Sequence, residues 1–365
     1  MKRNRYLSLL ISGLITGSTF CLFPVLTACG SDPLGHAATD PSGEFPVTFS
    51  IGTPASGEVE YTRVETESGK QVNSLKVYDF RVIGSGFGKK VLLSTVHYLK
   101  KVSAAPKSGE FTTGYNSSDG SLTATFTLSL RGTGNTATDA PHIFAFVANE
   151  EALHFDSIIR PGETPLDSLL YCFSTRRLKT DGNCDQLGGS KGFVMTSLTG
   201  EMSVSKDMGV ITGLPQLSRI VARIDVKHSV LAARNLKIVS LSARNCVPRG
   251  YLFGTDYAGS ATGEKNDYTH VVSVKHNTNV QSALENLSQG TCENVLYLYE
   301  QPAAVDGKDT SPVLLLTYTL NGAVNTMEVP LPTDSRLDIR RNTRYTLVVG
   351  TDNTSTRVVC RIQAE

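Results

Sequence analysis

The sequence contains no tryptophan, few charged residues and no excess of either charge sign. Lys and Arg number 35 and Asp and Glu 34, which gives a formal net charge of +1. Such a chain lacks the overall electrostatic field that attracts polyanions, so we expect no nucleic-acid partner. The absence of Trp weakens any prediction of a large aromatic platform for sugars. With 40% hydrophobic residues, 32 Gly and 15 Pro, the composition indicates a folded globular chain.

Three segments resemble motifs of enzymes, but none has both the spacing and the structural context that the chemistry requires. Residues 84–90 resemble a phosphate-binding loop but lack the G-x-x-x-x-G-K-[ST] spacing, which favours a glycine turn between strands. Residues 188–192 match G-x-S-x-G and residues 203–206 match S-x-x-K, yet neither segment has the helical context that the chemistry requires. The seven His include no pair at helical ligand spacing. We therefore predict no catalytic residue, no metal site, no cofactor and no enzyme activity.

The first 28 residues have the layout of a secretory signal. A basic stretch over residues 1–5 precedes a charge-free stretch over residues 6–25. The segment Leu-Thr-Ala-Cys that ends at Cys29 resembles the lipobox of bacterial lipoproteins, which implies a signal peptide over residues 1–28 and acyl chains such as palmitate on Cys29. The alternative is an ordinary membrane anchor with an incidental cysteine. No Asp directly follows Cys29, which favours the outer membrane, and residues 29–44 have the composition of a flexible tether.

An odd number of cysteines follows Cys29, in a compartment where disulfides form. They are Cys172, Cys184, Cys246, Cys292 and Cys360. Cys172 and Cys184 bracket a turn sequence, and we predict a local disulfide between them. The alternative for this pair is metal binding, although neither a C-x-x-C motif nor a neighbouring pair of His supports it. A bond between Cys246 and Cys292 is a second expectation.

Most of the remaining chain has the period-two alternation of β-strands. Half-buried strands are predicted over residues 45–51, 75–80, 122–128 and 220–226, and a central, fully buried strand over residues 142–149. Asn321 and Gly322 favour a type I′ hairpin between strands 313–320 and 323–331.

Two more strands close the chain, over residues 345–349 and 357–362, and short helices are predicted over residues 166–178 and 280–287. In the last strand Val358, Cys360 and Ile362 form an apolar face, as either a donor strand or an internal edge strand requires. A boundary near residues 205–209, or shortly after it around residues 214–216, divides the chain into two all-β domains, residues 45–208 and 209–365, each long enough for a β-sandwich.

Four segments resemble the fimbrillins, the pilin-like lipoproteins of Bacteroidetes that build type V pili. These are residues 142–149 (HIFAFVAN), 217–226 (LSRIVARIDV), 296–301 (LYLYEQ) and 339–347 (IRRNTRYTL). The resemblance implies two tandem transthyretin-like β-sandwich domains and assembly by donor-strand exchange, in which a strand from one subunit completes the sheet of the next. It also implies a structural or adhesive subunit on the cell surface, in a shaft, tip or anchor role.

In this family an arginine-specific protease removes the first strand together with the lipid. Arg63 lies in a charged stretch after the first predicted strand, so the resemblance implies cleavage between Arg63 and Val64; the alternative is an ordinary surface arginine. The implied partners are other fimbrial subunits, identical or different, a host or bacterial surface ligand, and the outer membrane until processing. Two alternative functions are open at this point. One is a monomeric glycan-binding lipoprotein of a nutrient-uptake system, and the other is an exported hydrolase, for which no motif gives support.

Overall fold

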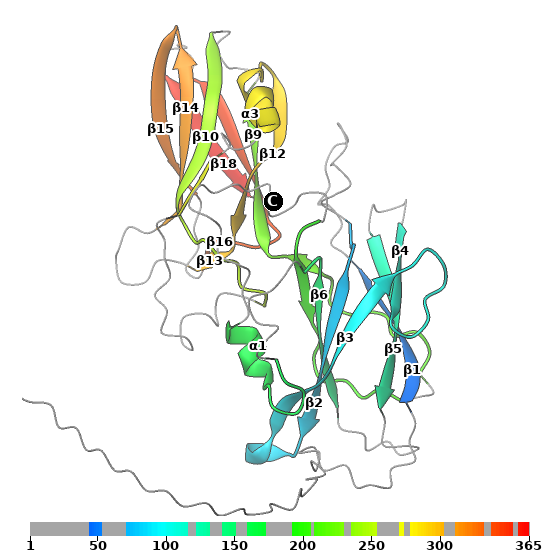
Figure 1. Ribbon diagram of the computed structural model, residues 1–365. Helices are drawn as coiled ribbons and strands as arrows, with labels where there is room; N and C mark the ends of the chain where they lie inside the picture. The colour runs from blue at the N-terminus through cyan, green and yellow to red at the C-terminus, as the bar shows by residue number, and fades with distance from the viewer. Residues whose placement is uncertain are drawn as a thin grey trace, which may run out of the picture. The chain divides into compact units, whose positions relative to one another are not determined.

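The computed structural model is an all-β protein, as the alternating sequence pattern predicts. It describes residues 44–52, 71–115, 122–131, 141–150, 159–172, 192–205, 208–229, 235–253, 270–273, 278–302, 311–331, 337–352 and 357–364. We call strands β1–β8 the first region and strands β9–β18 the second region (Figure 1).

The first region is one eight-stranded sheet in the order β1-β5-β4-β3-β2-β6-β7-β8. Its strands are β1 (Glu44–Gly52), β2 (Leu75–Ile83), β3 (Lys90–Lys101), β4 (Glu110–Tyr115), β5 (Leu122–Arg131), β6 (His142–Ala148), β7 (Met195–Leu198) and β8 (Ser218–Arg219). All seven residues of β6 are buried and β6 lies inside the sheet, as its apolar sequence predicts.

This sheet folds back on itself. Four strands separate β1 from β6 in the sheet order, which would place them roughly 24 Å apart in a flat sheet. The rings of Phe49 in β1 and Phe144 in β6 nevertheless have centroids only 5.1 Å apart. The β1-β5-β4 side therefore packs face to face on the β2-β6-β7 side, with an apolar core between them.

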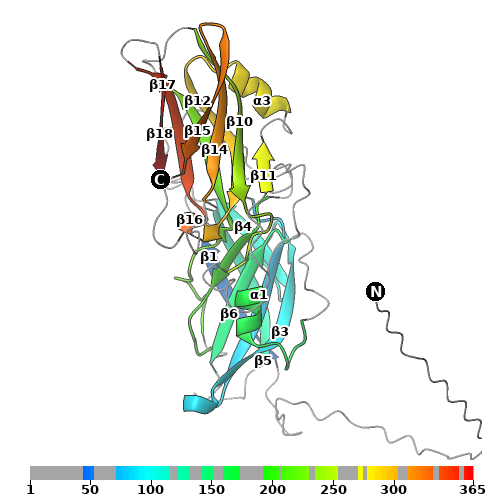
Figure 2. The ribbon, with the colours of Figure 1, turned by 90° about the vertical axis from the view of Figure 1, so that its left-hand side faces the viewer.

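The second region is built mainly from two four-stranded sheets, β12-β9-β17-β18 and β11-β10-β14-β15, which enclose a common core (Figure 2). Its strands are β9 (Val221–His228), β10 (Leu236–Cys246), β11 (His270–Ser273), β12 (Gly290–Tyr299), β13 (Gln301–Pro302), β14 (Val313–Leu320), β15 (Ala323–Pro330), β16 (Leu337–Ile339), β17 (Arg344–Thr351) and β18 (Val358–Ala364). Strands β9 and β17 pair in parallel, and the short β13 and β16 pair separately.

The two predicted helices are present, and the second has shifted bounds. Helix α1 spans Leu166–Cys172, and residues 173–178 of the predicted helix lie outside the described residues. Helix α3 spans Thr278–Glu285, so it begins and ends two residues earlier than predicted. The chain still coils beyond Glu285, because the Leu287 amide donates to the carbonyl of Leu284 at 3.2 Å.

Both predicted turns are confirmed. Asn321 and Gly322 join β14 to β15 with φ angles of 56° and 81°, as a type I′ turn requires. Residues 84–89 connect β2 to β3 through a short 3-10 turn, η2 (Gly86–Gly88), and hold no helix that could follow a phosphate loop.

The segment that leads from the first region to the second, residues 208–219, pairs with strands of the first region. Ile211 exchanges backbone hydrogen bonds with β1, and β8 pairs with β7, so the sheets change at Ile220, between β8 and β9. Residues 38–365 form one compact unit, and the domain boundary at residues 208 and 209 stays a prediction.

Candidate assembly site

Strand β1 places three apolar side chains in the core of the first region. Val47, Phe49 and Ile51 alternate along the strand and are at most 1% exposed. The residues between them point to the other face, where the hydroxyl oxygens of Thr48 and Thr127 lie 3.1 Å apart. This division follows from the period-two geometry of a strand with one buried face.

Phe49 is the centre of this contact. Its ring stacks on Phe126 of β5 at a centroid distance of 5.3 Å and meets the edge of Phe144 on the opposite side of the core at 5.1 Å. Phe126 in turn contacts Phe146 at 5.7 Å. Removing β1 would therefore expose an apolar groove with aromatic walls on both sides.

Both edges of β1 carry backbone hydrogen bonds. One edge pairs antiparallel with β5 along the whole strand, from Glu44 opposite Arg131 to Gly52 opposite Thr123. On the other edge the Ser50 amide donates to the Ile211 carbonyl at 2.8 Å and the Ile211 amide donates to the Thr48 carbonyl at 2.8 Å. Strand β1 is thus inserted between β5 and residue 211, and its loss would leave backbone groups unpaired on both sides.

The pairing at Ile211 was not predicted from the sequence. Residues 208–217 contain Gly and Pro and lack a strand pattern, and the structure gives Ile211 a single parallel bridge to Phe49. The Leu217 amide adds a hydrogen bond to the Gly52 carbonyl at 2.9 Å. Ile211, Leu214 and Leu217 recur at every third residue, which carries only a weak signal for this contact, although all three pack on the core.

The last strand, β18, lies at the edge of its sheet beside β17. Val358 is buried, and Cys360 and Ile362 are partly buried against the core of the second region, which confirms the predicted apolar face. Val359 on the opposite face is 51% exposed. In this position β18 covers its own core, and one backbone edge of the strand has no neighbouring strand among the residues that the structure describes.

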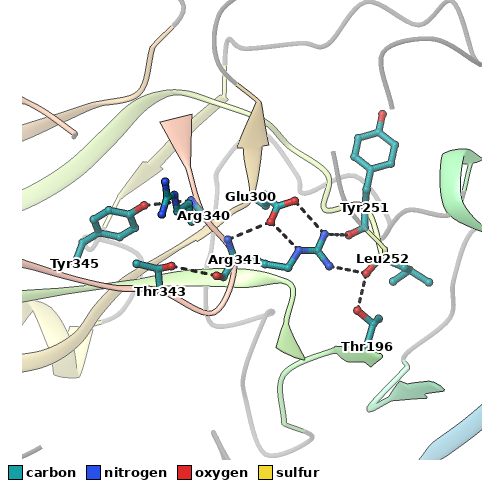
Figure 3. A network of polar contacts seen from close by, with 8 residues as sticks. All are labelled: Thr196, Tyr251, Leu252, Glu300, Arg340, Arg341, Thr343 and Tyr345. Atoms are coloured by element: carbon teal, nitrogen blue, oxygen red, sulfur yellow. Dashed lines mark hydrogen bonds and ion pairs between the residues drawn. The ribbon is translucent and has the colours of Figure 1, made fainter. Parts of the chain in front are cut away.

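A polar network around the ion pair of Arg341 and Glu300 in the second region extends to the first region (Figure 3). The Arg341 guanidinium donates to Glu300 at 2.7 Å, to the Leu252 carbonyl at 2.7 Å and to the Tyr251 carbonyl at 3.0 Å. The hydroxyl of Thr196 in β7 donates to the same Leu252 carbonyl at 2.6 Å. The network therefore connects the sheet of the first region to the segment that precedes β17.

Two of the segments that carry the sequence resemblance meet in this network. Glu300 comes from residues 296–301 and Arg341 from residues 339–347. The Tyr345 hydroxyl accepts a hydrogen bond from the Arg340 amide at 3.1 Å, which holds the turn before β17, and burial raises the pKa of Tyr345. These residues therefore have a structural role that the sequence resemblance did not assign to them.

A second buried carboxylate organises the β9-β17 pair. Asp225 is fully buried and accepts hydrogen bonds from Arg223 at 2.8 Å and from Arg344 at 2.7 Å. Its other oxygen accepts from the Asn294 amide at 2.7 Å. A buried carboxylate needs such partners because an unpaired charge in the core is strongly destabilising.

Most predicted site residues lie outside the described residues. This applies to Cys29, Arg63, Val64 and Cys184, while Cys172 ends α1 and its side chain is not described. Lipidation, processing and the Cys172–Cys184 disulfide therefore stay predictions. Cys246 and Cys292 are both buried thiols, so the expectation of a bond between them is wrong for this structure.

Neither a metal-binding cluster nor a membrane-spanning helix is present in the described part of the chain. No group of three or more His, Cys, Asp or Glu in these ranges could hold a metal ion, and the prediction that the chain binds none stays a prediction. No helix within them has the length and apolar character that crossing a membrane requires.

Comparisons with known proteins find similar structures and no similar family model. No model of a protein family matches the chain, and no curated protein matches it. Among solved structures, the tip fimbrial protein Mfa3 from Porphyromonas gingivalis is 15% identical with a TM-score of 0.49, and the match covers 87% of this chain and 99% of that one.

Two further solved structures are a fimbrial assembly protein from Parabacteroides distasonis and a fimbrial protein from Bacteroides vulgatus. The first is 11% identical with a TM-score of 0.46, covering 88% of this chain and 99% of that one. The second is 12% identical with a TM-score of 0.47, covering 88% and 99%. All three of these solved structures are of fimbrial proteins.

Proposed function

We propose that the chain is a structural or adhesive subunit of a cell-surface fimbrium, exported to the outer membrane as a lipoprotein through Cys29 and assembled by strand exchange. The observation that carries the proposal is the place of β1, which is buried on one face, paired with β5 along one edge and hydrogen-bonded to Ile211 and Leu217 on the other. An apolar strand with alternating residues from another subunit would satisfy the same groove and the same backbone groups.

The position of Arg63 fits this proposal. Arg63 lies between the end of β1 at Gly52 and the start of β2 at Leu75. Cleavage after Arg63 would break the covalent link between β1 and the rest of the sheet without cutting a described strand. Strand β1 would then be held by non-covalent contacts alone and could leave together with Cys29 and its lipid.

The first experiment is N-terminal sequencing of filaments sheared from cells. The proposal predicts subunits that begin at Val64 and carry no acyl chain. The Arg63→Ala variant should remain acylated at Cys29 and stay out of filaments, whereas the control Arg357→Ala, which changes an exposed arginine, should assemble normally. Filament subunits that begin at Cys29 would contradict the processing step.

A second experiment tests the groove directly. A chain cleaved after Arg63 should bind a synthetic peptide of residues 44–52, because the peptide restores Val47, Phe49 and Ile51 to the core. The same peptide with Phe49→Asp should not bind, because a carboxylate would enter an aromatic core without a partner. Equal binding of both peptides would argue against a groove that selects apolar side chains.

A further inference from the structure

The hairpin that joins β2 to β3 presents an unusual apolar tip. Phe87 is fully exposed, and Ile83 at the base of the turn is 37% exposed. Lys89 and Lys90 follow Phe87 after Gly88, and Lys89 forms an ion pair with Glu201. Single exposed aliphatic residues are normal on protein surfaces, but a phenylalanine without any covering side chain keeps its whole ring in water.

The turn holds Phe87 in this position. The Gly88 amide donates to the Ser85 carbonyl at 3.2 Å and the Lys89 amide donates to the Gly86 carbonyl at 3.2 Å. Gly84 has a φ of 79°, and a Cβ at this residue would lie 2.9 Å from the Gly88 carbonyl oxygen. The fold therefore requires glycine at the base of the turn and displays Phe87 on a defined hairpin.

The sheet topology places this tip at the end where β1 begins. Strand β3 runs parallel to β4, β4 runs antiparallel to β5, and β5 runs antiparallel to β1. Strands β1 and β3 consequently run in the same direction, so Glu44 and Lys90 start at the same end of the sheet. Residues 29–43 connect Cys29 to Glu44 and can span at most roughly 50 Å.

We infer that the β2–β3 tip is a membrane-contact element that docks on the bilayer holding the lipid anchor. Phe87 inserts below the headgroups, and Lys90, next to Lys89, faces anionic headgroups. The inference rests on the acylation of Cys29 in the proposed function. A tethered tip at the anchored end meets the bilayer at a high effective concentration, so one aromatic side chain suffices for a weak second contact.

The absence of Trp makes a direct test available. The acylated full-length chain carrying Phe87→Trp is reconstituted into vesicles that contain phosphatidylglycerol, with or without brominated acyl chains. We expect its emission to shift to shorter wavelength and to be quenched by the brominated lipid. The matched control Val324→Trp, at an exposed apolar position on β15, should show neither change.

A charge variant tests the role of the headgroups. Adding Lys90→Glu to Phe87→Trp should shift the equilibrium away from the docked tip by roughly fivefold or more in anionic vesicles, and less in zwitterionic ones. Unquenched emission from the acylated Phe87→Trp chain would overturn the inference and leave the proposed fimbrial function standing. An emission shift of the Phe87→Trp chain that occurs only in assembled filaments, without quenching by brominated lipid in vesicles, would assign the tip to a protein partner and overturn it as well.

The anchor is checked separately by mass spectrometry. A chain without acyl groups on Cys29 would remove the premise, and both the lipoprotein proposal and the membrane-contact element would then be wrong. An acylated chain that docks through Phe87 but never enters filaments would support the inference and contradict the fimbrial proposal. The two failures are therefore distinguishable.

Discussion

Strand β1 of the first region and the segment before β17 in the second region are held by different forces. The side chains of β1 contribute aromatic and aliphatic contacts around Phe49. The segment around Arg341 is held by charge-assisted hydrogen bonds to Glu300 and to two carbonyls. Apolar packing is non-directional, whereas a guanidinium needs its acceptors at fixed positions.

This difference indicates which parts of the fold can be exchanged. Any strand with apolar residues at alternate positions can fill the groove of β1, with some loss of fit. The Arg341 segment cannot be replaced in this way, because another sequence would leave Glu300 buried without its partner. The apolar contacts of β1 are therefore compatible with the strand exchange that we propose, whereas the Arg341 segment requires a fixed structure.

The largest expected effect of a single substitution is in the core around β1. Phe49→Ala removes a fully buried ring and leaves a cavity between Phe126 and Phe144, which should lower the free energy of unfolding by about 3–5 kcal/mol. Urea unfolding followed by circular dichroism measures this. Phe87→Ala, at the exposed tip, is the matched control and should change stability by at most about 0.5 kcal/mol. Equal effects would show that β1 is not part of the stable core.

Much of the fold could be predicted from local sequence patterns. The alternation in β1, the apolar run of β6 and the Asn321-Gly322 turn each reflect a local rule, and all three predictions are confirmed. Strand β3 was missed, because its twelve residues mix lysines and polar side chains with apolar ones and only two of the twelve are buried.

The candidate site depends on contacts that no local pattern contains. The pairing of Ile211 with β1 joins residues far apart in the chain through backbone groups, which leave no trace in side-chain identity. The meeting of Glu300 with Arg341 likewise depends on the placement of β13 and β16 and of the turn before β17. The sequence resemblance pointed to both segments but could not show that they contact each other.

An intermediate effect is expected from breaking the ion pair of the second region. Arg341→Met leaves the Glu300 carboxylate and the carbonyls of Tyr251 and Leu252 without their donor, and should lower the free energy of unfolding by about 2–3 kcal/mol. Arg244→Met is the control, because the Arg244–Glu328 pair is exposed and should contribute at most about 1 kcal/mol. If Arg244→Met lowered the free energy of unfolding more than Arg341→Met, the claim that the buried pair contributes more stability than the exposed pair would be wrong.

The smallest expected effect is a difference in alkaline stability between the two regions. In the second region burial raises the pKa of Cys360 to about 11, and burial together with the charges of Asp225 and Glu293 raises the pKa of Cys292 to about 11. In the first region burial lowers the pKa of Lys101.

Whether each region gains or loses stability as the pH rises depends on which protonation state of the buried group the fold prefers. The neutral thiols stabilise the second region fully below pH 9.0, their ordinary pKa, and this contribution is lost as the pH rises through about 11. For Lys101 the fold prefers the neutral amine, so raising the pH relieves a small penalty in the first region. The second region should therefore weaken relative to the first between pH 9 and 11.

Calorimetry at pH 8.5 and 10.5 measures this change in stability. The double variant Cys292→Ala with Cys360→Ala should show a smaller fall in melting temperature between these pH values than the natural chain.

The rate of thiol alkylation tests the raised pKa values independently. At pH 8 a pKa of about 11 leaves roughly a hundredfold less thiolate than a pKa of 9.0. Both cysteines should react slowly in the native chain and rapidly in urea. Fast native alkylation would mean that the sheets of the second region open readily, and the expected protection of both thiols by burial would be wrong.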